Sequence, residues 1–136
     1  IIDFTSNSLP VFNYGTAHPD AGTGFDYSGL SQKTMTDGKK ALWMGDANSD
    51  GKIKYQAPND DIFTIFTDVL THPGNTSFNY NFNAAYGYYS GDVNMDGKVK
   101  LQAPGDDSFK IFSQILLYPL NSSFNYNFDL LYEGLD

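Results

Sequence analysis

Oxygen-bearing side chains recur at a fixed short spacing in this 136-residue sequence. Asp46, Asn48 and Asp50 stand at the first, third and fifth positions of one segment, and Gly51 stands at the sixth. Alternate side chains of a tightly curled loop converge on one point, and Ca²⁺ prefers roughly six to eight oxygen ligands. Glycine allows the sharp turn because it adopts positive φ without steric cost. We therefore predict a calcium site in this segment.

The same arrangement returns as Asp92, Asn94, Asp96 and Gly97. The alternative interpretation is a metal-free turn, because Asp, Asn and Gly favour turns by themselves. Without a cation, however, two carboxylates a few ångströms apart repel by roughly 3 kcal/mol at an effective dielectric near 20. Two copies in register therefore favour calcium, with one Ca²⁺ in each copy.

Two further loop positions have expected roles. The backbone carbonyls of Lys52 and Lys98 would each add an oxygen ligand without needing a particular side chain. Ile53 and Val99, which follow them, are β-branched and apolar. We expect these two side chains to anchor the back of each loop in the core.

The twelfth loop position departs from the calcium pattern, since it holds Ala57 or Ala103 instead of an acid. Two acids follow shortly afterwards in each copy: Asp60 and Asp61, and Asp106 and Asp107. Helix N-termini favour carboxylates in any case. We expect Asp61 and Asp107 to close the loops as ligands, with Asp60 and Asp106 as helix caps or further ligands.

The calcium segments belong to an internal repeat of 46 residues, 45–90 and 91–136, in which 25 of the 46 positions are identical by direct count. Each copy continues into Gln-Ala-Pro and then a helix that begins near the acid pair and ends at Pro73 or Pro119. The apolar stripes of these helices are Ile62, Phe63, Ile65, Phe66, Val69 and Leu70 in the first and Phe109, Phe112, Ile115 and Leu116 in the second.

Residues 75–82 and 121–128 follow the helices and alternate Asn with aromatic residues. Strict alternation predicts a half-buried strand. We favour core packing for its aromatic face over a binding role.

Residues 1–44 lie outside the repeat. Segments 1–4 and 9–14 are typical of short extended strands, and segments 32–36 and 39–44 flank Asp37-Gly38, a strong hairpin signal. The expected fold class is α+β, with tandem calcium-loop-plus-helix repeats and short β-strands preceded by a small β-hairpin segment.

The two copies of Gly-Asp-x-Asn-x-Asp-Gly-Lys-[Ile/Val], each followed by a helix, contain the front half of an EF-hand-type loop and resemble the dockerin family over residues 45–71 and 91–117. That resemblance implies Ca²⁺ binding by the loops and docking onto a cohesin partner in an extracellular assembly. The Gln-Ala-Pro insertion and the 46-residue period depart from the dockerin pattern.

Composition narrows the class further. The formal net charge is −8, from 16 acidic and 8 basic residues, and all the basic residues are Lys. No basic patch is present for nucleic acid, and no apolar run is long enough to insert into a membrane. Without Cys there are no disulfides, so bound calcium would stabilise the fold instead. Weak calcium loops suit an extracellular or cell-surface location, and the start without Met suggests a processed product or fragment.

Three non-enzymatic functions fit these features. The first is a calcium-binding structural module for assembly, which self-associates into a fibre when its N-terminal segment, residues 1–14, adds as a strand to another copy. That segment could equally pair within its own domain. The second is a dockerin-like module that docks a secreted or surface protein onto a protein partner. The third is a carbohydrate-binding module that uses Trp43, Tyr86, Tyr88 and Tyr89 for stacking on glycans.

We expect no catalytic residues. The only histidines are His18, in a loop, and His72, at a helix C-terminus where an imidazolium suits the dipole. Calcium already accounts for the clustered acids, so no separate pair is left for glycoside hydrolysis.

Asn75 and Asn121 begin N-glycosylation sequons at matching repeat positions. A surface position would allow glycosylation. The alternative is turn chemistry after each helix.

Overall fold

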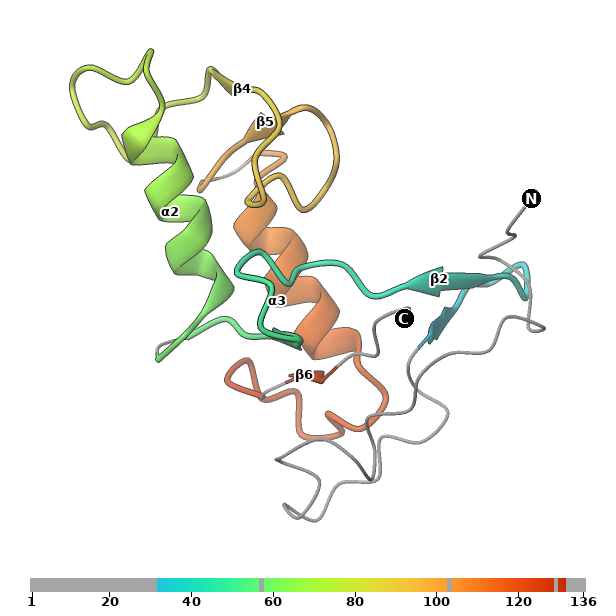
Figure 1. The fold of residues 1–136 in the computed structure, drawn as a ribbon. Coiled ribbons are helices and arrows are strands. Elements are labelled where there is room, and N and C mark those ends of the chain that lie inside the picture. The colour runs from blue at the N-terminus through green and yellow to red at the C-terminus, as the bar shows by residue number, and fades with distance from the viewer. Residues whose placement is uncertain (1–31, 57, 103, 129, 132–136) are drawn as a thin grey trace. The chain divides into compact units, whose positions relative to one another are not determined.

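The computed structural model describes residues 32–56, 58–102, 104–128 and 130–131 (Figure 1). The chain divides into two compact units, one formed by Ile1–Trp43 with Leu131–Asp136 and the other by Met44–Leu130. Apart from its last residues, the internal repeat therefore belongs to a single unit. The strands expected at residues 1–4 and 9–14 lie outside the described residues.

The predicted hairpin is present in the smaller unit. Strand β1 (Gln32–Thr34) pairs antiparallel with β2 (Lys40–Leu42), with Lys33 opposite Ala41. The connection is longer than a two-residue turn, because the Met35 N–H donates to the Lys39 carbonyl and the Gly38 N–H to the Met35 carbonyl, both at 2.9 Å. Gly38 takes the left-handed conformation there, with φ of 81°.

Both predicted helices form in the larger unit. Helix α2 (Asp61–Thr71) and helix α3 (Asp107–Leu117) have equal lengths and matching positions in the repeat. They pack against each other and run antiparallel (Figure 1). The presence of helices and short antiparallel strand pairs agrees with the expected α+β class.

The short strands connect the two repeats reciprocally. Strand β3 (Lys52–Ile53) belongs to the first predicted calcium segment, residues 46–53, and is hydrogen-bonded to β6 (Leu130–Leu131) near the end of the second repeat. The second predicted calcium segment is residues 92–99. Strand β5 (Lys98–Val99) of the second calcium segment pairs with β4 (Ala85–Tyr86) near the end of the first. Each calcium segment thus takes its strand partner from the other copy.

The core of the larger unit lies where these strands meet the helices. Ile53 and Val99 are fully buried, as predicted for residues that anchor the loops. The helices bury Ile65, Val69, Ile111 and Ile115. Phe63 and Phe109, which the helical stripes assigned to the core, are mostly exposed, so the buried face of each helix is narrower than predicted.

Glycines at the start of the calcium segments allow the close packing between repeats. A Cβ on Gly45 would lie 3.3 Å from Ile111 of α3, and a Cβ on Gly91 would lie 3.1 Å from the backbone of Ile65 in α2. The Gly91 N–H also donates to the Asp68 carboxylate at 2.9 Å. Each calcium segment therefore packs on the helix of the other repeat.

The strands predicted at residues 75–82 and 121–128 are wrong, because both segments fold as consecutive turns. The Phe78 N–H donates to the Asn75 carbonyl at 3.2 Å, and the Phe82 N–H donates to the Asn79 carbonyl at 3.0 Å. Asn79 also donates its N–H to the Asn75 side chain at 2.9 Å. Asparagine side chains that bond to nearby backbone compete with strand formation, and here they hold Phe78 at a positive φ of 51°.

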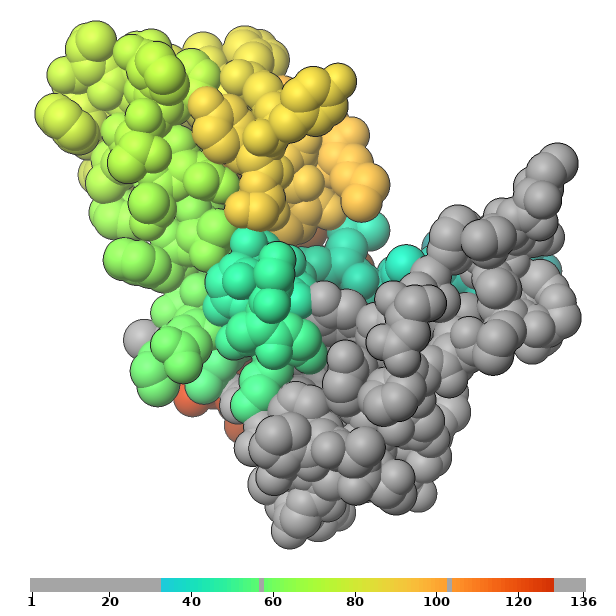
Figure 2. All heavy atoms as spheres, viewed as in Figure 1, coloured from blue at the N-terminus to red at the C-terminus, as the bar shows by residue number. Residues whose placement is uncertain are grey.

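The aromatic face of these turns does not fill the core. Phe78 and Phe124 expose 72% and 70% of their surface, and Tyr80 and Tyr126 are also exposed. The first of these turns lies beyond the C-terminal end of α2, in yellow-green in Figures 1 and 2. The alternation thus arises from consecutive turns and not from a strand. Their last rings, Phe82 and Phe128, are half-buried against His72 and Tyr118.

The sequon asparagines are buried, which contradicts the surface position that glycosylation requires. Asn75 is 3% exposed and Asn121 is 2% exposed. The Asn75 amide donates to the Val69 carbonyl at 2.8 Å and to the Asn79 carbonyl at 2.9 Å, and the Asn121 amide makes the equivalent pair. Both amide hydrogens are in use, so the side chain closes the C-terminal end of the helix, as the turn alternative proposed.

Across the described part of the chain, none of the helices combines the length and the apolar character needed to cross a bilayer.

We predict that Asn75→Asp lowers the free energy of unfolding by about 2–4 kcal/mol. The aspartate would lose both donors and place a buried charge against two carbonyl oxygens. Chemical denaturation in calcium buffer measures the change, and Asn79→Asp is the matched control because that exposed side chain only accepts a hydrogen bond, from the Asn81 N–H. Equal losses in the two variants would contradict the role assigned to Asn75.

Candidate metal centre

The first calcium segment curls so that its oxygen side chains face inward. The Asp50 N–H lies 3.0 Å from Oδ1 of Asp46 and 2.9 Å from Oδ1 of Asn48, so these two oxygens meet at one point. The Gly51 N–H donates to the second Asp46 oxygen at 3.1 Å. Gly51 has a φ of 82°, the left-handed conformation predicted for it.

The second segment repeats this geometry. The Asp96 N–H lies 3.1 Å from Oδ1 of Asp92 and 2.8 Å from Oδ1 of Asn94. The Gly97 N–H donates to the other Asp92 oxygen at 2.8 Å. Agreement in every one of these bonds shows that the two loops have one conformation.

Asp61 joins the beginning and end of the first loop, although fifteen positions separate it from Asp46. Its Oδ1 accepts hydrogen bonds from the N–H groups of Ala47 at 2.7 Å and Asn48 at 3.2 Å. Its Oδ2 accepts from the Lys54 N–H at 2.7 Å. This residue therefore occupies the place from which a closing ligand would reach the loop.

Asp107 has the same role in the second loop. Its two oxygens accept from the Asn94 N–H at 3.1 Å and the Lys100 N–H at 2.8 Å. Both closing aspartates are fully buried, with 0% exposure.

The other acid of each pair caps a helix. The Asp60 side chain accepts from the Phe63 N–H at 2.8 Å, and Asp106 accepts from the Phe109 N–H at the start of α3. Both residues are in the extended conformation typical of an N-cap. Of the two roles left open for this acid, the structure shows capping.

A two-bond clamp explains how the Gln-Ala-Pro insertion is accommodated. The Lys54 N–H donates to the Asp61 side chain, and the Asp61 N–H donates back to the Lys54 carbonyl at 3.0 Å. Lys100 and Asp107 form the equivalent pair, with 2.9 Å for the backbone bond. These bonds hold Asp61 next to Lys54 and Asp107 next to Lys100, so each acid lies beside its loop although the insertion separates the two in sequence.

The closing carboxyls lie in a strongly perturbed electrostatic environment. Burial raises the pKa of Asp61 to about 7, although three backbone N–H donors oppose the shift and Asp46 adds to it. Burial likewise raises the pKa of Asp107 to about 6, with the charges of Asp92 and Asp96 adding to it. A bound cation would remove this cost by compensating the negative charge.

The candidate ligands fit a hard cation, because every side-chain ligand atom is a carboxylate or amide oxygen. Asp46, Asn48 and Asp50 would hold the ion in the first loop, with the Lys52 carbonyl and Asp61; the second loop offers Asp92, Asn94, Asp96, the Lys98 carbonyl and Asp107. The described residues contain no group of three or more His, Cys, Asp or Glu side chains close enough to hold a metal. In each loop one candidate ligand is an asparagine, and the closing aspartate accepts hydrogen bonds from backbone N–H groups.

Sequence reasoning did not find the Lys–Asp clamp. Its partners are backbone groups, so residue type at Lys54 and Lys100 gives no signal. One usable signal was that the same number of residues separates the loop from the acid pair in both copies. A constant number indicates that the insertion has one fixed structure.

Comparisons with protein-family models, with curated proteins and with solved structures return no match.

We predict that the metal-free protein melts at a lower temperature at pH 8 than at pH 5. Because folding raises the pKa of Asp61 and Asp107 above the ordinary 3.8, the associated stability is fully present below about pH 4 and is lost as pH rises through 6 to 7. Thermal melts of chelator-treated, dialysed protein would measure this. Asp61→Asn with Asp107→Asn should flatten the dependence, and a pH-independent melting temperature for the parent protein would contradict it.

Proposed function

We propose that this chain is a non-enzymatic, extracellular structural module that binds two Ca²⁺ ions, one in each repeat. The observation that carries the proposal is the pair of matching loops, each with converging oxygens and a buried carboxylate returned to the loop by the Lys–Asp clamp. Such buried carboxylates are costly without a compensating charge. Two identical arrangements of that cost favour a resident cation.

The acids that could serve catalysis already have structural contacts, which supports a structural function. Asp61 closes a loop and Asp60 caps a helix. His72 also has two local contacts, since its Nδ1 accepts from the Gly74 N–H at 3.0 Å and its Nε2 lies 3.3 Å from the Tyr86 carbonyl oxygen. His18 lies outside the described residues.

We predict two calcium ions per chain and a large fall in melting temperature with EGTA, reversed by Ca²⁺ and less well by Mg²⁺, whose octahedral geometry is stricter. At a dissociation constant of about 10 μM and about 1 mM calcium, each ion adds roughly 2.7 kcal/mol. Titration calorimetry gives the number of ions, and thermal melting gives the stabilisation.

Variants at the two acids of the first pair sharpen this test. Asp61→Ala should reduce the calcium count to one, whereas Asp60→Ala should keep both ions and lose only a cap worth about 1 kcal/mol. An EGTA-insensitive melting curve in the parent protein would overturn the calcium proposal.

The assembly part of the proposal is supported by the exposed rings of the Asn-rich turns. Phe78 and Phe124 occupy equivalent positions, both with left-handed backbone and most of the ring in solvent. Tyr80 and Tyr126, two residues further along each segment, are exposed as well, so each turn presents two rings to solvent. A chain with two equivalent patches can contact two neighbours, and such contacts extend into a fibre when they do not close. We propose a second copy of this chain as the occupant.

The N-terminal strand addition predicted for residues 1–14 stays a prediction, because that segment lies outside the described residues. The two routes to a fibre can be separated, since one needs the exposed rings and the other needs the N-terminal segment.

We predict concentration-dependent association in calcium that Phe78→Ser with Phe124→Ser reduces about tenfold or more, as expected for the loss of two buried aromatic contacts. Sedimentation velocity measures the association constants. Deletion of residues 1–14 in the parent protein tests the strand route in parallel. Only monomers at high concentration, with calcium bound, would exclude self-assembly while leaving the calcium proposal intact.

A further inference from the structure

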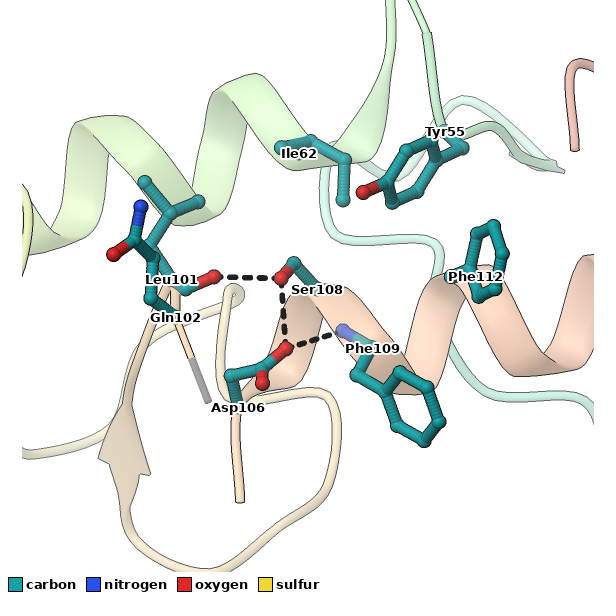
Figure 3. Close-up of a pocket in the computed structure, with 8 residues that line it drawn as sticks. All are labelled: Tyr55, Ile62, Leu101, Gln102, Asp106, Ser108, Phe109 and Phe112. Carbon is teal, nitrogen blue, oxygen red and sulfur yellow. Dashed lines mark hydrogen bonds between the residues drawn. The ribbon is translucent and has the colours of Figure 1, made fainter. Parts of the chain in front are cut away.

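A hollow of about 530 Å³ lies between the first turns of α2 and α3 (Figure 3). One wall comes from Tyr55 and Ile62 of the first repeat. The other wall comes from the second repeat, including Gln102, Asp106 and Phe112. No residue of 46–54 or 92–100 lines it, so the hollow does not include the oxygen side chains of the first half of either loop.

The Gln-Ala-Pro excursions build much of this hollow. Tyr55 lies between the clamped residues Lys54 and Asp61, and Leu101, Gln102 and Asp106 of the lining lie between Lys100 and Asp107. Calcium loops close without such an insertion. The hollow therefore gives the residues of the insertion a second role beside that of leading to the closing aspartate.

Three aromatic side chains make part of the lining of the hollow apolar. Tyr55 and Phe112 meet edge to face, with ring centroids 5.3 Å apart. Phe109 lies 6.2 Å from Phe112 and is 60% exposed. These rings provide flat apolar faces that solvent reaches.

The rest of the lining includes polar groups that can form hydrogen bonds. The Ser108 hydroxyl oxygen lies 2.8 Å from Oδ1 of Asp106 and 2.6 Å from the Leu101 carbonyl oxygen, so two acceptors share its single proton (Figure 3). Within the described ranges, Oδ2 of Asp106, the Tyr55 hydroxyl and the exposed Gln102 amide have no hydrogen-bond partner. The hollow therefore offers a fixed carboxylate acceptor together with groups that both donate and accept.

The charge of the lining limits which ligands are suitable. It contains Asp106 and no Lys or His, and the whole chain carries −8, so an anion is disfavoured. A neutral sugar ring matches both the aromatic and the polar residues of the lining. Its C–H face packs on aromatic rings, and its hydroxyls form hydrogen bonds with carboxylate, amide and phenol groups. We propose that this hollow binds a neutral saccharide, with Phe109 and Tyr55 as the stacking surface and Gln102 and Asp106 as hydrogen-bond partners.

The internal repeat supplies matched controls for this site. Gln56 and Phe63 occupy the positions of Gln102 and Phe109 in the first repeat and are equally exposed, yet neither lines the hollow. The two copies do not form equivalent walls, because their sequences differ at matching positions. Tyr55 of the first repeat corresponds to Leu101 of the second, and Ile62 corresponds to Ser108.

The test uses the full chain in calcium buffer with a panel of neutral tetrasaccharides: cello-, xylo-, malto- and mannotetraose. Saturation-transfer NMR identifies binding, and titration calorimetry gives the dissociation constant. We expect at least one sugar to bind, Gln102→Ala to weaken it about three- to tenfold through loss of hydrogen bonding, and Phe109→Ala to weaken it at least as much. Gln56→Ala and Phe63→Ala should leave it unchanged.

Tyr55→Phe removes only the hydroxyl and keeps the ring contact with Phe112, so it tests the polar contribution without disturbing the fold. Melting curves in calcium verify that each variant is folded. The proposal is overturned if no sugar of the panel binds, if the first-repeat variants weaken binding as much as their second-repeat partners, or if tetramethylammonium binds in place of the sugars. None of these outcomes bears on the calcium count, so the two proposals can fail separately.

Discussion

The larger unit depends on one buried carboxylate in each repeat. Asp61 accepts hydrogen bonds from the start of the calcium loop and from Lys54 at its end, and it is also the first residue of α2. The same side chain therefore fixes the loop, closes the insertion and sets the direction of the helix. Asp107 repeats the arrangement. Because burial raises the pKa of both carboxyls, the same two positions also carry an electrostatic cost when they are ionised.

The parts of the fold that depend on local pattern were predictable. The helices follow from apolar periodicity and from the prolines after them, and the hairpin follows from Asp37-Gly38. The left-handed glycines and the buried Ile53 and Val99 follow from the loop pattern. These features need only a few neighbouring residues, so a single sequence contains enough information.

The parts that depend on side-chain hydrogen bonds to backbone were not predictable. Alternation of Asn and aromatic residues is the same in a strand and in consecutive Asn turns, and only the bonds made by Asn75 and Asn79 separate the two. Phe63 and Phe109 fit a helical stripe, but the close packing at Gly45 and Gly91 brings the other repeat onto only part of that stripe. The candidate ligands were named from spacing, whereas the clamp that returns Asp61 to the loop involves backbone groups that spacing does not reveal.

The reciprocal pairing of β3 with β6 and of β4 with β5 has a consequence for the origin of the chain. A single 46-residue unit would hold one loop strand and one partner strand, and the pairing seen here would then require a second, identical molecule. Duplication and fusion would then have converted a symmetric dimer into one polypeptide. The two halves differ at the equivalent positions Tyr55 and Leu101, and Ile62 and Ser108, all four of which line the hollow.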